Sequence, residues 1–263
     1  MFYSKAILQY DGSNYAGFQW QKNAHTIQEA INRALALSHK GQCTTMSASR
    51  TDSGVHALGQ VIRITSTTPF TGQDHLARLN HHLPSQIRVL TLDACEQSFN
   101  PALDSLSKEY SYLFTNRQQA SETERKYVAN ISNPLNLSSM NDGIREIIGT
   151  KDFCNFVSTG SSSKTTIRTV QKCELTQINP HDFLQASALF PLPKELQSCF
   201  RLRIQANGFL KQMIRHLVAG LWRVGSGKLS VDEFIHLLHS PKNPRQLWRV
   251  ASPSGLYLFK INY

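Results

Sequence analysis

The chain has 263 residues, with 28 Lys and Arg against 18 Asp and Glu, so its formal charge is +10 with histidine neutral. At 40% hydrophobic residues it can bury a full core, which excludes wholesale disorder, and its length predicts one large or two ordinary domains. The longest apolar run of the C-terminal half, residues 217–222, is far short of the roughly 20 residues that cross a bilayer. We therefore expect no membrane span.

The cysteines and the charge indicate a compartment and a class of partner. Five cysteines without any CxxC spacing argue against a disulfide framework or a thiolate zinc site, and no secretory signal opens the chain, so we expect the cytoplasm. A basic chain without a membrane segment favours a polyanion such as nucleic acid, although an ordinary basic enzyme remains an alternative. Residues 201–228 contain six Lys or Arg and no acid, which favours phosphate contacts.

The hydrophobic periodicity of residues 1–103 predicts a first α/β unit. Residues 3–10 and 60–66 read as strands, and residues 87–92 are rich in β-favouring side chains. Thr26 and Glu29 have the spacing of a capping box, and the apolar residues behind them predict a helix over residues 27–38.

A boundary near residues 98–107 separates this unit from a second one, residues 104–263. It is predicted to contain strands at residues 109–115, 165–176, 198–206 and 256–263, and helices at 140–148, 208–224 and 231–239. Residues 118–141 read as a polar, irregular insertion, and residues 160–163 as a flexible loop. The expected fold class is α/β (α+β): two similar units, each with a mixed or antiparallel sheet flanked by helices.

The polar loop Ala48–Ala57, with the sequence ASRTDSGVHA, is the strongest candidate for chemistry. Taken alone it is open to two interpretations. Asp-Ser-Gly is good turn chemistry, and Arg50 could pair with Asp52 at the surface for little energy. Alternatively, nearby cations lower the pKa of a carboxylate and keep it nucleophilic.

This loop resembles the GRTDxGVHA motif of the TruA family of tRNA pseudouridine synthases, and other family motifs follow in order along nearly the whole chain. They are Tyr10-Asp11-Gly12, Tyr15–Gln19, Thr26-Ile27-Gln28, Leu79-Asn80, Leu83-Pro84, Lys108–Tyr112, Gly149, Asp152-Phe153, Phe156, Thr166–Thr169, Phe209-Leu210, Met213, Arg215, Gly220 and Gly255–Leu258. The chain departs from the family pattern at four positions: Ser49, Ser53, Glu109 and Lys151.

The resemblance implies a pseudouridine synthase fold with a cleft between the two units. It implies an isomerase that converts uridine to pseudouridine in the tRNA anticodon stem-loop, at positions 38–40 in tRNA numbering. Asp52 would be the catalytic nucleophile, Arg215 the arginine that pairs with it, Tyr110 the tyrosine that stacks on the flipped base, and Arg50 the arginine that helps extrude the nucleotide. The resemblance also implies a homodimer.

The basic residues of the second unit are the predicted RNA contacts. They are Lys211, Arg201, Arg203 and Arg168, with Lys211 expected one helical turn before Arg215. His236 and His239 lie at metal-ligand spacing but are only two ligands, so no metal is expected, and the chemistry requires no cofactor.

Two other functions remain as alternatives. A catalytically silent RNA-binding module could have the same scaffold, although it would not need the set of residues around Asp52. A glycosidase would need a second acid at motif spacing, which the loop lacks.

Overall fold

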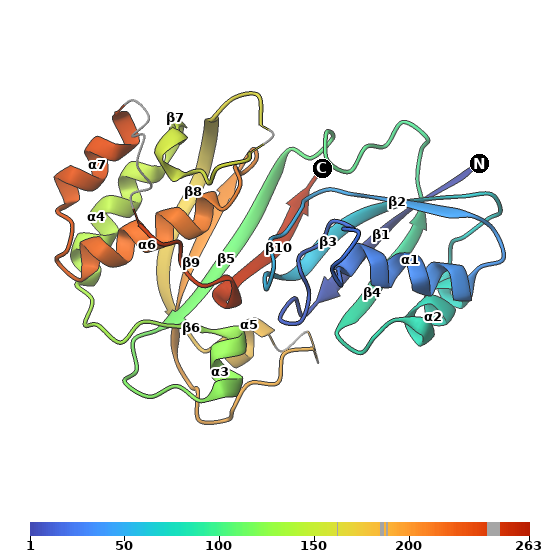
Figure 1. The fold of residues 1–263 in the computed structure, drawn as a ribbon, viewed down its shortest axis with the longest axis horizontal. Coiled ribbons are helices and arrows are strands. Elements are labelled where there is room, and N and C mark those ends of the chain that lie inside the picture. Colours follow the sequence, from blue (N-terminus) through green and yellow to red (C-terminus); the bar gives the residue numbers. More distant parts are fainter. Residues whose placement is uncertain (162, 185–186, 188, 241–247) are drawn as a thin grey trace. The chain divides into compact units, whose positions relative to one another are not determined.

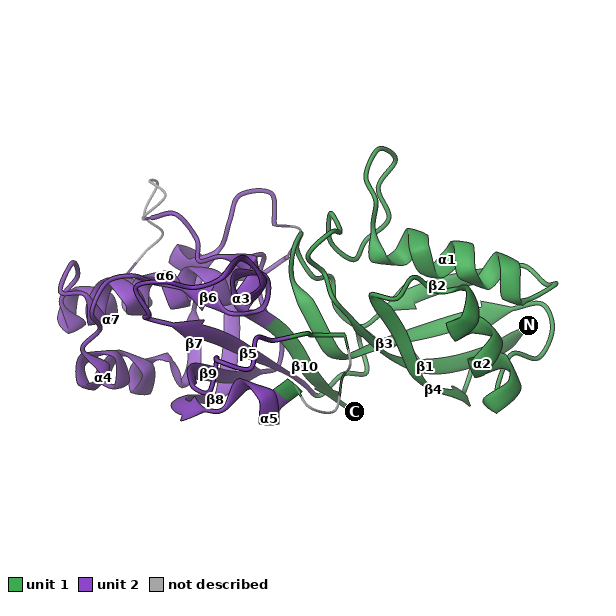
Figure 2. Ribbon diagram, turned by 90° about the horizontal axis from the view of Figure 1, so that it is seen from below, with its two compact units in different colours: residues 1–106, 184–191, 257–263 green, residues 107–183, 192–256 purple. Residues whose placement is uncertain are grey.

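The computed structural model describes residues 1–161, 163–184, 187, 189–240 and 248–263. These residues form two compact units, coloured separately in Figure 2. Unit 1 comprises residues 1–106, 184–191 and 257–263, and unit 2 comprises residues 107–183 and 192–256. Three stretches that the sequence assigned to the second unit, 104–106, 184–191 and 257–263, thus lie in unit 1.

Unit 1 is built on a sheet of long strands (Figure 1). Strand β1 (Phe2–Tyr10) is antiparallel to both β3 (His56–Ser66) and β4 (Ile87–Ala94), and β2 (Cys43–Ser47) is antiparallel to β3. The last strand, β10 (Leu256–Asn262), runs parallel to β3, with Tyr257 paired to His56. Helix α1 (Ile27–Ser38) packs against α2 (Gln73–His82), and α2 also packs against β4.

Helix α1 forms for the reason that its sequence predicted. Thr26 accepts a hydrogen bond from the Glu29 amide while the Glu29 side chain accepts one from the Thr26 amide, so the capping box is present. Ile27, Ile31 and Leu35 recur at helical spacing and are buried.

Unit 2 has an antiparallel sheet in the order β5-β9-β8-β7, covered by helices (Figure 1). Its strands are β5 (Ser107–Thr115), β6 (Ala129–Asn130), β7 (Gly149–Asp152), β8 (Ile167–Ile178) and β9 (Cys199–Ala206). Its helices are α3 (Glu122–Tyr127), α4 (Leu137–Ile147), α5 (Pro180–Leu184, whose last residue belongs to unit 1), α6 (Met213–Gly225) and α7 (Val231–His239), with 3-10 turns at Cys154–Phe156 and Pro253–Gly255. Short β6 runs parallel to β5.

Side chains of β5 point alternately to the two faces of the sheet, and this alternation determines which of them pack against the helices. Tyr112 and Phe114 point to the helix side, where both rings lie edge-on to Trp222 of α6, with centroids 5.8 and 5.6 Å away. Helices α4, α6 and α7 pack on one another. The predicted fold class, α/β with mixed and antiparallel pairing flanked by helices, is confirmed.

Several local predictions are wrong. The stretch 118–141 contains α3, whose capping box joins Ser121 and Glu124, and not only an irregular insertion. Helix α6 begins at Met213 instead of residue 208, because Gln212 has a left-handed backbone with a φ of 59°.

The predicted loop 160–163 includes residue 162, which lies outside the described residues. Among the described helices, none has the length and apolar character needed to span a membrane.

Candidate active site

The motif loop, residues 48–57, connects β2 to β3 and is bonded to the opening segment, residues 10–19. The amide of Phe18 donates to the carbonyl of Thr51 at 3.1 Å. The Ser53 hydroxyl and the Gly54 amide both donate to the carbonyl of Tyr15, at 3.1 and 3.3 Å. Bonds on both sides of Asp52 therefore fix the backbone that carries its carboxylate.

Two glycines allow the opening segment to approach the loop closely. Gly17 has a φ of +105°, and a Cβ there would lie 2.8 Å from the Thr51 carbonyl oxygen. A Cβ on Gly12 would lie 2.0 Å from the carbonyl oxygen of Val55. A side chain at either position would therefore displace the motif loop.

Gln60 of β3 holds the start of the loop. Its side-chain amide donates to the Ser49 carbonyl at 2.7 Å and accepts from the Ser49 amide at 3.3 Å. The same amide group donates to the Tyr10 hydroxyl at 3.3 Å, and that hydroxyl is 2.8 Å from the hydroxyl of Thr51. The structure thus accommodates both serine departures in the loop, since Ser49 is bonded through its backbone and Ser53 through its hydroxyl.

His56 and Asp11 form a buried pair at the other end of the loop. His56 Nδ1 lies 3.2 Å from both Asp11 Oδ1 and the Gly12 amide nitrogen. With its proton on Nε2 the ring accepts from the Gly12 amide, whereas with a proton on Nδ1 it donates to Asp11. The imidazole is fully buried, stacked on Tyr257 and edge-on to Phe190, with centroids 4.8 and 5.5 Å away.

Burial alone would raise the pKa of Asp11, but hydrogen bonds from His56 and Ser13 outweigh it and lower the pKa to about 2. Asp11 is therefore ionised at neutral pH. Asp52 itself is half-buried, and Arg50 beside it is exposed. In unit 1 the structure thus places both predicted residues on one fixed loop.

Unit 2 contributes Tyr110 and Arg215. Tyr110 of β5 is 6% exposed, and its ring lies edge-on to Phe209 at 5.2 Å. Arg215 of α6 is 8% exposed, and its Nε donates to the Ala251 carbonyl at 2.7 Å, while the Ala251 amide donates to the Arg215 carbonyl at 3.1 Å. A solvent-facing arginine would show neither the burial nor the anchoring.

His216 beside Arg215 is a buried polar residue that the sequence did not indicate. Burial first, and then the charge of Arg215, lower its pKa to about 4, so the ring is neutral at physiological pH. The ring Nε2 lies 2.9 Å from the hydroxyl of Ser158, which also donates to the side chain of Gln212 at 2.5 Å. These bonds tie the start of α6 to the segment that follows β7.

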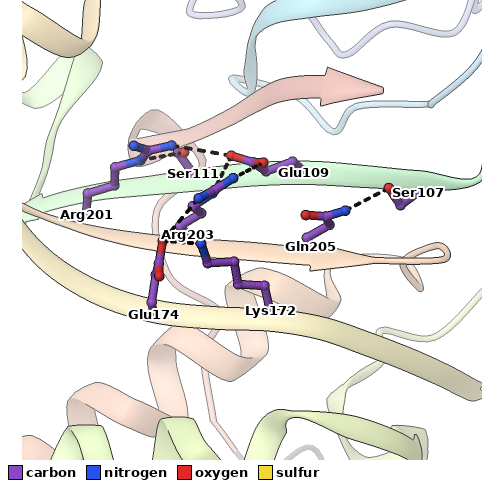
Figure 3. A network of polar contacts seen from close by, with 8 residues as sticks. All are labelled: Ser107, Glu109, Ser111, Lys172, Glu174, Arg201, Arg203 and Gln205. Atoms are coloured by element: carbon purple, nitrogen blue, oxygen red, sulfur yellow. Dashed lines mark hydrogen bonds and ion pairs between the residues drawn. The ribbon is translucent and has the colours of Figure 1, made fainter. Parts of the chain in front are cut away.

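Arg201 and Arg203, two predicted RNA contacts, belong to an ion-pair network on the sheet of unit 2 (Figure 3). Arg203 holds the buried Glu109 carboxylate in a bidentate pair, with both bonds at 2.7 Å. The Arg201 guanidinium contacts Glu109 at 3.4 Å and Ser111 at 2.9 Å. Glu109, noted as a departure from the family pattern, therefore balances charge on this face, and Glu174 on β8 adds a second acid 3.2 Å from Arg203.

Lys211 and Arg168, the remaining predicted RNA contacts, lie outside the ion-pair network of Arg201 and Arg203. Lys211 is exposed and precedes α6, and its Nζ donates to the Thr159 carbonyl at 2.9 Å. The prediction that it lies one helical turn before Arg215 is therefore wrong. Arg168 of β8 is half-buried and donates to the carbonyls of Thr165 and Ile167 at 2.9 and 2.6 Å.

No cluster of three or more metal-ligating side chains occurs in the part of the chain that the structure describes. The sequence also missed Gln60 as the residue that holds the loop, although Asp11 and His56 lie in the motifs that it singled out.

Comparison with known proteins identifies the family. A family model described as "tRNA pseudouridine synthase" matches residues 6–101 and 144–263, which is most of the chain. The chain belongs to the tRNA pseudouridine synthase family.

Curated relatives named "tRNA pseudouridine synthase A" align over almost their whole length. The relative from Thermoanaerobacter sp. (strain X514) is 38% identical over 257 residues, which are 98% of each chain. The relative from Syntrophomonas wolfei is 34% identical, over 98% of this chain and 96% of its own. The relative from Bartonella tribocorum is 32% identical, over 98% of both chains. The motif loop, the opening segment and Arg215 all lie within the family match.

Proposed function

We propose that this protein isomerises uridine to pseudouridine in tRNA, at positions 38–40 of the anticodon stem-loop, with Asp52 as the nucleophile. The observation that carries the proposal is the fixed motif loop. In a member of the tRNA pseudouridine synthase family, the loop that bears the motif aspartate is bonded on both sides of that residue to a second family motif. Such a loop fixes the backbone position of the residue that carries the carboxylate, which favours the defined placement that a nucleophile requires.

The reaction breaks the N-glycosidic bond of uridine, rotates the base and rejoins it through a ring carbon, which loses its proton while the freed ring nitrogen gains one. The Asp52 carboxylate attacks or stabilises the reacting carbon, which a neutral acid cannot do. Extrusion of the base from its stack costs about a few kcal/mol. Tyr110 supplies an aromatic face for the extruded base, and the exposed Arg50 replaces part of the stacking that the base loses. Arg215, anchored through Ala251, supplies a fixed positive charge to the aspartate.

The pairing of Arg215 with Asp52 joins residues of the two units, so it rests on the family resemblance, and a substitution tests it. Arg215→Ala should lower the single-turnover rate at saturating tRNA more than it lowers tRNA affinity. A normal rate in this variant would refute the pairing. Of the proposed RNA contacts, Lys211 and Arg168 contribute charge toward the phosphates, whereas Arg201 and Arg203 do so with their charge partly balanced by Glu109 and Glu174.

The test of the reaction uses an unmodified tRNA transcript with labelled uridine, digested after incubation and analysed for pseudouridine. Asp52→Asn should abolish turnover while tRNA affinity stays within about tenfold, because phosphate contacts dominate affinity. Asp93→Asn, which neutralises an exposed acid of unit 1, is the matched control and should keep wild-type activity. Near-normal turnover in Asp52→Asn would remove Asp52 from the mechanism.

The same assay distinguishes the alternative of a silent RNA-binding module, which would bind tRNA and produce no pseudouridine. We also propose a homodimer, which the family resemblance implies, and a cytoplasmic location, which the cysteine usage of the sequence favours. Sedimentation of the purified protein tests the dimer.

A further inference from the structure

A cavity of 360 Å³ lies in unit 2 beside the last turn of α6. The loop that follows β6 and segment 248–252 both line it. All of the lining residues belong to unit 2, and neither Asp52 nor Arg215 is among them. Cavities from about 300 Å³ upward hold small ligands, and this one has room for a single nucleotide.

The charged residues of this cavity, here called the α6 pocket, are all positive. Arg223, Lys228 and Arg249 line it, and no Asp or Glu does. Within the described parts of the chain, none of the three cations forms an ion pair. The pocket therefore favours an anion, in contrast to the Arg201–Arg203 face, where Glu109 and Glu174 balance the charge.

Two tryptophans line the α6 pocket, and three of its lining residues each contain a buried polar atom without a hydrogen-bond partner in the described part of the chain. Trp222 and Trp248 both line the α6 pocket, and the Arg223 guanidinium lies 5.9 Å from the centroid of the Trp248 ring. The Nε1 of Trp222, the Nε of Arg223 and the Oδ1 of Asn130 are buried and have no hydrogen-bond partner among the described residues.

Each unpaired buried polar atom costs about 1–3 kcal/mol, and native structures contain few of them. Three beside one cavity, two donors and one acceptor, indicate that a ligand supplies the missing partners. Since these atoms are closed off from solvent, side-chain rotations must accompany binding.

The wall formed by segment 248–252 leads to the proposed active-site arginine. Ala251 lines the pocket and also accepts the hydrogen bond from Arg215, while Ser252 lines it and accepts from the Tyr112 hydroxyl at 2.8 Å. Trp248 donates from its ring to the His216 carbonyl at 3.1 Å. A ligand in the pocket therefore contacts the segment that anchors Arg215.

We propose that the α6 pocket binds one nucleotide of the RNA other than the uridine that reacts. The three cations hold its phosphate, and the tryptophan rings contact its base, as in other sites for single-stranded nucleic acid. That this RNA is tRNA rests on the proposed function.

A structural explanation of the same cations makes a different prediction. Arg223 lies in the last turn of α6, where a positive charge stabilises the helix dipole. If the cations served only the helix, their removal would lower stability and leave RNA affinity unchanged.

The experiment uses the tryptophans as the reporter. The chain has three, and Trp20→Phe leaves only the two that line the α6 pocket. This variant is titrated with a hexamer of adenylate, which contains no uridine, while tryptophan fluorescence is recorded. We expect saturable quenching, and the added pair Lys228→Ala and Arg249→Ala should raise the half-saturating concentration several-fold. With tRNA, the same pair should reduce the salt slope of binding by about 1 to 2.

The matched control removes two exposed cations of unit 2 that already have acidic partners, Lys126→Ala and Arg145→Ala. It should leave the quenching and the salt slope unchanged. Three results would refute nucleotide binding in the α6 pocket. They are absence of quenching, an equal effect in both double variants, and a change confined to the unfolding free energy. Quenching without pseudouridine formation would refute only the proposed function, whereas pseudouridine formation without quenching would refute only the pocket.

Discussion

The pair of Asp11 and His56 predicts a pH-dependent contribution to stability that one substitution isolates. Asp11→Asn keeps the shape of the side chain and removes its charge. The Asp11 carboxyl is almost fully buried, accepts from the Ser13 amide at 2.9 Å and lies 3.2 Å from His56. The substitution therefore removes a charged partner of His56 beneath the motif loop.

The lowered pKa of Asp11 sets the size of this contribution to the unfolding free energy. Lowering it from 3.8 to about 2 corresponds to about 2 kcal/mol of unfolding free energy, since one pH unit is worth about 1.4 kcal/mol. Because the pKa is depressed in the folded state, this contribution is complete above about pH 5 and is lost as the pH falls toward 2. About half of it is gone at pH 3.

The assay is urea unfolding of the wild type and of Asp11→Asn between pH 7 and pH 3. The variant should be about 2 kcal/mol less stable at pH 7 and about 1 kcal/mol less stable at pH 3. Asp93→Asn, at an exposed site, should show no such dependence. A stability difference for Asp11→Asn that is constant across this range would refute the ionic role of the pair.

Three further substitutions test the fold and the RNA contacts. Glu109→Ala leaves two guanidinium groups without their shared acid and should cost about 3 kcal/mol in urea unfolding, against little for the exposed Glu96→Ala; equal effects would refute the network. Gly12→Ala places a Cβ 2.0 Å from a backbone oxygen of the motif loop and should lower both activity and melting temperature, whereas Gly208→Ala, with ordinary contacts, should not; a normal Gly12→Ala enzyme would show that the loop can move. Lys211→Ala should reduce the salt slope of tRNA binding by about one and leave saturated turnover unchanged, and an unaltered affinity would exclude this lysine from the interface.

Local signals in the sequence predicted the elements that depend on them. The capping box at Thr26 and the apolar spacing behind it gave the bounds of α1, and helix α7 also matches its predicted range. Helix α2 has only Leu79 buried and begins after Gly72 without a side-chain cap, so neither a capping residue nor a run of buried residues marked it in the sequence. The capping box at Ser121 was present in the sequence and would have predicted α3.

The site was predictable in its residues but not in its contacts. Asp52, Arg50, Tyr110 and Arg215 follow from motifs, which say nothing of what fixes each side chain. The bond of Gln60 to Ser49 spans 11 residues of the sequence, and the pairing of Arg203 with Glu109 spans 94. Periodicity does not contain such contacts, because they depend on strand pairing, as between β5 and β9.

Strand β10 has a consequence for the order in which the protein forms during synthesis. Its residue Tyr257 pairs with His56 in the sheet of unit 1, and its ring stacks on the imidazole that ends the motif loop. A ribosome produces the rest of that sheet about 160 residues before it reaches this tyrosine, and domains generally fold as units while the chain emerges. The sheet of unit 1 therefore lacks β10 until all of unit 2 has been translated. A nascent chain acquires its finished aspartate loop only at the end of translation, so a prematurely terminated product would carry the motif without its final support.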